Sequence, residues 1–202
     1  MKKFYVVYSG IHHVLHALKV MQENEILESF YTSFVIKNDL YKVLSKINNS
    51  KFLKVLELRD FREIDSGKIH NYPIYEFVEL LMKQLLGKNY FTTTLMPHWR
   101  DVNFAKRVSK NIQRDCLGVY GYPNNVLESF EAVSENSIKI VEQPIGHISS
   151  AVKLFYQEKN LNPEFSDSIT YNNTDKKFLE RISQEYSLSN LVCVPSNFVK
   201  KT

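Results

Sequence analysis

Short apolar runs alternate with stretches of helical periodicity along this chain, and the alternation constrains the fold more than any other feature. Residues 4–8 form a β-rich run that ends at Ser9-Gly10, and apolar side chains then recur at helical spacing over residues 11–21. The same order returns at residues 117–120 and 138–141, each followed by a predicted helix. Strands that alternate with helices pair in parallel. The sequence therefore predicts an α/β fold, a Rossmann-like parallel β-sheet flanked by helices on both faces.

Further elements complete this pattern. We expect two more strands, over residues 28–33 and 191–194, the second of them buried. We expect helices over residues 39–47, 73–86, 101–114, 124–133, about 149–158 and 174–186. Asn124 and Thr174 are the predicted helix caps. Residues 60–71 predict a loop, residues 51–58 fit a strand or a short helix, and residues 89–100 show no clear pattern.

Composition limits the class of partner. The chain has 202 residues, of which 44% are hydrophobic and 24% are charged, as in an ordinary globular domain. Its net charge of +4 is spread along the chain in both signs, without a basic stripe, so we expect no nucleic-acid partner. No apolar stretch approaches the ~20 residues of a membrane helix. We expect a cytoplasmic protein, with peripheral attachment at the inner face of the membrane as an option.

The predicted helix over residues 73–86 has a marked apolar face that includes Phe77, Leu81 and Leu85. We expect this face to pack on the protein core. The alternative is an amphipathic helix on a membrane surface, with Lys83 and Lys88 beside the apolar face.

The ends of the predicted strands are where a ligand is expected. In open parallel sheets, ligands bind beyond the carboxyl ends of the strands. The segments in that position are residues 9–10, 31–33, 121–122, 142–143 and 195–196.

Four of these regions carry a family resemblance. The run Ser9-Gly10-Ile11-His12-His13 resembles the acceptor-site loop of family 4 glycosyltransferases, two-domain enzymes of the GT-B fold. Residues 30–33 and 141–147 are similar to the second strand and the fifth-strand tip of bacterial members that act on cell-surface polysaccharides. Residues 185–199 resemble the stretch that closes the N-terminal domain of these enzymes. Ser189-Asn190 stands there where the family usually has Ala-Asp.

The resemblance implies that this chain is the N-terminal, acceptor-side domain of such an enzyme. The domain would cover residues 1–196, and residues 197–202 would begin the linker to a C-terminal nucleotide-sugar domain. The parent enzyme would transfer a sugar, with retention, from a nucleotide-sugar donor to a cell-surface polysaccharide or lipid-linked glycan. The donor is a substrate, and no cofactor is implied. We expect the chain to be an inactive fragment by itself. The alternative is a non-catalytic Rossmann-like module that binds a glycan or a nucleotide.

Glu142 and His147 are the predicted catalytic residues. They flank a Pro-Gly loop after a predicted strand, where either side chain could orient an acceptor hydroxyl or assist proton transfer. The resemblance implies no covalent role for Glu142. The structural alternatives are that Glu142 binds loop amides and that His147 is a polar residue at a helix start.

Gly10, His12 and His13 are predicted to contact the acceptor or the donor phosphates, because a helix N-terminus attracts anions and glycine lets a ligand approach the backbone. Gln143 and Tyr122 join this set, and the ring of Tyr122 can stack on a sugar. His12 has a metal-compatible spacing with the histidine four residues later, but no acidic ligand accompanies the pair, so we expect no metal. Exposed or capping histidines are the alternative.

Overall fold

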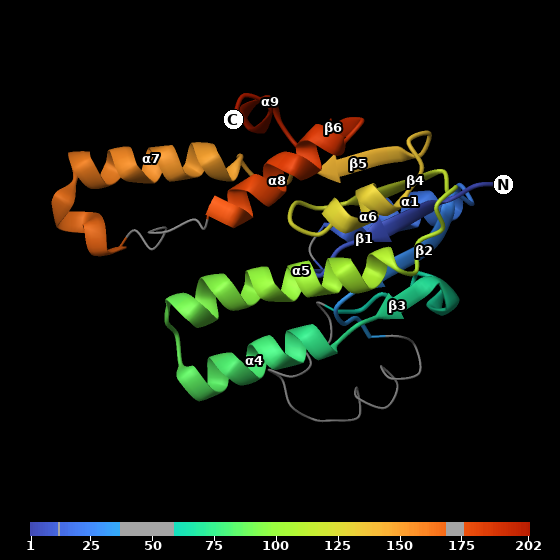
Figure 1. Cartoon of the computed structure of the whole chain (residues 1–202), viewed down its shortest axis with the longest axis horizontal. Coiled ribbons are helices and arrows are strands. Elements are labelled where there is room, and N and C mark those ends of the chain that lie inside the picture. The colour runs from blue at the N-terminus through green and yellow to red at the C-terminus, as the bar shows by residue number, and fades with distance from the viewer. Residues whose placement is uncertain (12, 37–58, 169–175) are drawn as a thin grey trace.

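The computed structural model describes residues 1–11, 13–36, 59–168 and 176–202, which form one parallel sheet covered by helices (Figure 1). In this part of the chain the strands are β1 (Phe4–Val7), β2 (Leu27–Thr32), β3 (Ile69–Asn71), β4 (Gly118–Gly121), β5 (Ile138–Glu142) and β6 (Leu191–Cys193). They lie in the order β3-β2-β1-β4-β5-β6, and every adjacent pair is parallel. The predicted fold class, α/β with a Rossmann-like parallel sheet, is confirmed.

The described helices are α1 (Val14–Glu23), α4 (Ile74–Leu86), α5 (Met96–Ser109), α6 (Leu127–Ala132), α7 (Ile148–Leu161), α8 (Lys176–Leu188) and α9 (Asn197–Lys200). Three shorter helical turns accompany them: η1 (Ser66–Lys68), the π-helical turn η2 (Phe91–Leu95) and η3 (Pro163–Ser168).

Successive side chains of β1 enter opposite faces of the sheet, so both faces carry a core. Tyr5 and Val7 join the core under α5 and α6. Val6, between them, joins the core under α1, together with Leu18 and Phe30. This arrangement explains why β1 reads as a continuous apolar run rather than an alternating one.

Two expectations for the first half of the chain were wrong in part. Residues 60–71 are not all loop, because β3 pairs with β2 there and Ile69 is buried opposite Phe30. A strand of three residues is too short to show a period. Residues 89–100 contain η2, which leads directly into α5, so this helix begins at Met96 rather than at residue 101.

The last strand was predicted to be buried, and this is also wrong. Leu191 is 52% exposed and Val192 is 39% exposed. The reason is position, since β6 is the last strand of the described sheet and its one neighbour among the described strands is β5.

The orientation of α4 corrects a fourth expectation. Its apolar face does not pack on the core of the described residues, since Phe77 is 70% exposed and Leu85 is 68% exposed. The side that faces the protein carries Glu76 and Glu79, both held in ion pairs. The predicted helix over residues 39–47, the ambiguous residues 51–58 and the cap Thr174 lie outside the described residues.

We predict that Gly121→Ala destabilises the fold at the centre of the sheet. A Cβ atom at Gly121 would lie 2.4 Å from Val126 Cγ1 and 2.4 Å from the Val7 carbonyl oxygen, and backbone cannot easily move there. We expect the free energy of unfolding in urea to fall by about 1–3 kcal/mol. Gly67→Ala is the control, because its nearest contact would be Asp65 Oδ1 at 3.4 Å. Equal stability of the two variants would contradict this account.

Candidate functional site

The tips of β1, β4 and β5 meet at the carboxyl edge of the sheet, and Glu142 stands at their junction. The hydroxyls of Tyr120 and Tyr122 both donate to Glu142 Oε2, the second at 2.8 Å. The ring of Tyr122 is stacked on that of Tyr8, with 4.0 Å between centroids. The observed partners of the carboxylate are thus tyrosine hydroxyls rather than the loop amides of the structural alternative.

The environment of Glu142 makes its carboxylate a better proton acceptor. Burial raises the pKa of Glu142 above its usual range, and the nearby His13 charge offsets part of this effect. Both phenols bind Oε2 of Glu142, so neither of these two hydrogen bonds uses the other carboxylate oxygen, Oε1. A half-buried carboxylate with raised pKa can orient a ligand hydroxyl and accept its proton.

His13 occupies a strained backbone position directly before α1. Its φ is 66°, in the left-handed region, and its side chain makes no capping hydrogen bond to the helix. His13 is thus exposed, as its structural alternative predicted, and its side chain does not cap α1, while its electrostatic effect reaches Glu142. His12 lies outside the described residues.

The structure shows why residue 10 is a glycine, which the sequence alone does not reveal. A Cβ atom there would lie 2.6 Å from Cζ of the Tyr8 ring. Glycine at this position therefore permits Tyr8 to lie over the β1 tip, against Tyr122. Tyr8 is only partly buried, whereas Tyr122 is 2% exposed, so Tyr8 is the more accessible ring of the pair. Tyr8 was not among the predicted site residues, although it ends the first predicted strand.

His147 is the N-cap residue of α7, and its structural alternative, a polar residue at a helix start, is confirmed. Its Nδ1 accepts a hydrogen bond from the Ser149 amide at 3.2 Å, which requires a lone pair on that nitrogen. Burial lowers the pKa of His147, in agreement with a neutral ring. Gln143 holds the same loop, since its Nε2 donates to the Ile145 carbonyl at 2.5 Å and its Oε1 accepts from Tyr186.

A cavity of about 520 Å³ lies beside these residues, within the size range of small-ligand sites. Its wall includes Tyr8, Tyr122, Gln143, His147, Phe178 and Tyr186. The cavity thus brings together three of the predicted site residues, which come from two different strand tips. Glu142 touches this wall through the Tyr122 hydroxyl, and Gly10 and His13 are not part of the lining.

A second polar cluster, which sequence reasoning missed, joins the β1 and β4 tips to α5. Ser9 Oγ donates to Asp101 Oδ1 at 2.7 Å, and Asn124 Nδ2 donates to Asp101 Oδ2 at 2.9 Å. His98 Nδ1 lies 3.1 Å from Asn124 Oδ1. Because the serine hydroxyl binds the carboxylate directly, with no imidazole between them, this is not a nucleophile triad. The cluster fixes the two strand tips in place.

The start of α6 is capped from a distance by Glu185, and not by Asn124 as predicted. The Glu185 carboxylate accepts the backbone amides of Asn124 at 2.5 Å, Val126 at 3.0 Å and Leu127 at 3.1 Å. The side chain is fully buried, and burial raises its pKa to about 7. Asn124 has a left-handed φ of 71° instead, and its side chain joins the Asp101 cluster.

The described residues contain no group of three or more histidine, cysteine or carboxylate side chains with the geometry of a metal site. No helix in the described ranges has the length and apolar character needed to cross a membrane.

Comparisons with known protein families, with curated proteins and with solved structures gave no match to this chain. The function is therefore inferred from the strand tips, the cavity and the residues that connect them.

We predict that Glu185 gives the fold a pH dependence. Its folded pKa of about 7 lies above the ordinary 4.5, so its stabilising contribution is complete below about pH 4.5 and is lost as pH rises through 7. Glu185→Gln should abolish this loss, which amounts to at most about 3 kcal/mol. Urea unfolding at pH 5 and pH 8 measures the difference.

The exposed Glu180→Gln on the same helix is the control, and it should retain the wild-type pH dependence. Parallel pH profiles for wild type and Glu185→Gln would contradict the assignment.

Proposed function

We propose that this chain is the acceptor-side domain of a retaining glycosyltransferase. The parent enzyme transfers a sugar from a nucleotide-sugar donor to a cell-surface polysaccharide or a lipid-linked glycan. The observation that carries the proposal is the Tyr8–Tyr122 pair on the cavity wall, tied by a phenol to Glu142 at the carboxyl edge of the sheet. Aromatic rings bind the apolar faces of sugars. The family resemblance of residues 9–13, 141–147 and 185–199 supports the same function.

In this proposal the acceptor lies against Tyr8 and presents a hydroxyl to Glu142. The raised pKa of Glu142 suits proton acceptance from that hydroxyl. His13 lies at the start of α1, where a donor phosphate is favoured, and its ring acts electrostatically on the carboxylate. His147 can act only through Nε2, because its Nδ1 accepts the Ser149 amide.

The donor nucleotide belongs, in the same proposal, to a C-terminal domain that follows a linker beginning at residue 197. The proposed location is the cytoplasmic face of the membrane, where lipid-linked glycans are extended. No cofactor is needed beyond the donor substrate.

A non-catalytic glycan- or nucleotide-binding module is the second candidate. The hydrogen bonds of the cavity wall favour this candidate. The Nε2 atom of Gln143 and the Nδ1 atom of His147 are already hydrogen-bonded within their own loop. The remaining wall is mainly apolar and aromatic. Such a cavity can bind a ligand without reacting with it.

We predict that His13→Asn lowers sugar transfer by the full-length enzyme about a hundredfold. Asparagine tolerates the left-handed φ of 66° at this position, so the fold should be retained. Transfer of radiolabelled sugar from a panel of nucleotide sugars measures the effect, and circular dichroism checks folding.

His16→Asn is the matched control, because His16 is an exposed histidine on the next turn of α1 and should retain wild-type transfer. Wild-type turnover in His13→Asn would remove His13 from the site. If the wild-type protein bound glycans but transferred sugar from none of the donors, the binding module would be the correct function.

A further inference from the structure

The cavity beside the candidate site is bounded by α7 and α8 and has an uncharged wall. Apolar side chains come from both helices, among them Leu154 and Phe155 of α7 and Phe178 and Ile182 of α8. Of the described residues, no lysine, arginine, aspartate or glutamate lines the cavity. Figure 1 shows α7 extending away from the sheet, so the wall on that side is a helix.

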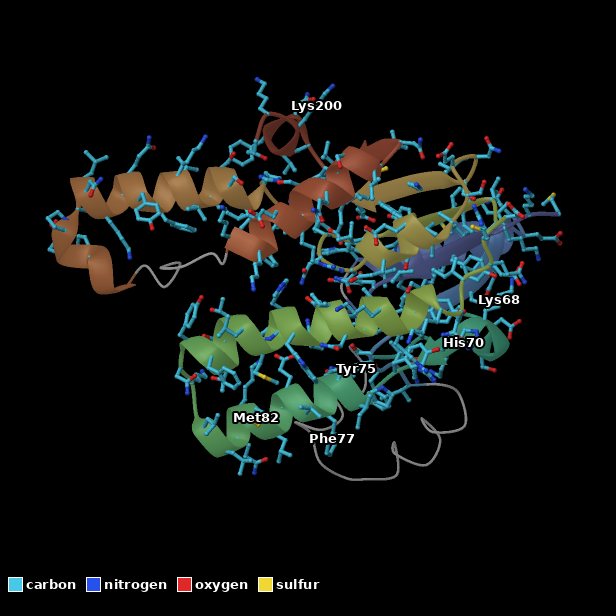
Figure 2. All side chains as sticks on the ribbon, in the orientation of Figure 1. Lys68, His70, Tyr75, Phe77, Met82 and Lys200 are labelled. Carbon is cyan, nitrogen blue, oxygen red and sulfur yellow. The ribbon has the colours of Figure 1, made fainter. Side chains whose placement is uncertain are left out.

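Neighbouring cations do not supply the missing charge. Lys153 is exposed on α7 and is not part of the lining. Figure 2 shows the Lys200 side chain on the outer side of α9, whereas Phe198 of the same helix lines the cavity. His147 also lines it, and because burial lowers the pKa of His147, this ring is neutral at pH 7. A phosphate or carboxylate would lose its water of hydration here and meet no counter-charge.

Polar side chains of the wall are already hydrogen-bonded within the protein. Gln143 Oε1 accepts from the Tyr186 hydroxyl. Ser150 Oγ donates to the Thr202 carbonyl at 2.7 Å, and Thr202 Oγ1 donates to the Val199 carbonyl, also at 2.7 Å. A sugar that entered this cavity would give up water at most of its hydroxyls without gaining new partners. An apolar group loses no hydrogen bond there and removes apolar surface from water.

The wall also has apolar surface that a ligand can cover. Leu154 is 54% exposed and Phe198 is 71% exposed, although both line the cavity. Ring faces of Phe178 and Tyr186 belong to the same wall. The volume of about 520 Å³ suits a small molecule rather than a segment of another protein.

We propose that this cavity binds a small neutral ligand through an aryl or alkyl group. The group lies between α7 and α8, and the hydroxylated part of the ligand lies toward Tyr8. The inference does not depend on sugar transfer, because dye binding tests it without a donor. It holds for the acceptor of a transferase and for the ligand of a binding module alike.

The experiment uses two fluorescent dyes with the full chain. N-phenyl-1-naphthylamine and 8-anilinonaphthalene-1-sulfonate share one ring skeleton and differ by a sulfonate group. We expect the neutral dye to bind about tenfold more tightly than the anionic one. Phenyl β-glucoside and octyl β-glucoside, the latter below its micellar concentration, should displace the neutral dye. The stronger of the two competitors identifies the group as aryl or alkyl. Methyl β-glucoside carries the same sugar without that group and should leave the dye bound.

The test variant is Leu154→Lys, and the matched control is Leu161→Lys on the same helix. Leu161 is 73% exposed and does not line the cavity. Both leucines are largely in water already, so both variants should fold as wild type does by circular dichroism. A cation in the wall should weaken binding of the neutral dye about fivefold and strengthen binding of the anionic dye about fivefold. The control should bind both dyes as wild type does.

Three results would overturn the proposal. If Leu154→Lys and Leu161→Lys bound the two dyes equally, the dye would lie outside the cavity. If methyl β-glucoside displaced the neutral dye as well as the other glucosides do, the cavity would be a sugar site. If benzyltrimethylammonium displaced it more strongly than benzyl alcohol, the aromatic wall would be a site for organic cations. The competition measurements use wild type alone, so they test the proposal independently of how the variants fold.

Discussion

The Glu185 carboxylate is the interaction on which the arrangement of the site depends. Three backbone amides at the start of α6 need acceptors, and one buried side chain from α8 supplies them. A buried carboxylate without partners is strongly unfavourable. The helix end and the side chain therefore satisfy one another, and α8 becomes fixed to the turn that follows β4. Arg181, one turn earlier on α8, lies 4.0 Å from Glu185 and pairs with Glu128 of α6 at 2.5 Å, which strengthens the same connection.

This connection determines where the site residues lie. The turn held by Glu185 contains Asn124, whose side chain reaches the Asp101 cluster, and it follows directly on Tyr122. Helix α8 also carries Tyr186, which donates to Gln143 at the β5 tip. One carboxylate thus holds the β4 tip and, through the next residue of its helix, the β5 tip. The cavity between these tips keeps its shape because both walls are attached to α8.

The alternation of apolar runs and helical periods was sufficient to predict β1, β2, β4 and β5, and with them the edge where Glu142, Gln143 and Tyr122 meet. Contacts between distant residues were not predictable in the same way. Asp101 binds Ser9 across 92 positions, and no local pattern indicates that pair. The cap on α6 comes from a residue some sixty positions later, so the nearby Asn124 was the natural choice and the wrong one. Family resemblance named candidate residues but could not indicate that Gly10 makes room for Tyr8.

The reversal of α4 shows two physical demands in conflict. Periodicity predicts that the apolar face of α4, with Phe77, Leu81 and Leu85, turns inward, because burying one such side chain is worth about 1.5–3 kcal/mol. Separating Glu79 from Arg100 would leave a buried charge without its partner, at about 3–5 kcal/mol, and would also disturb Asp101, which shares Arg100. Rotation of the helix satisfies one demand only by violating the other. The ion pairs therefore set the rotation of α4, and its apolar side chains stay exposed within the part of the chain that the structure describes.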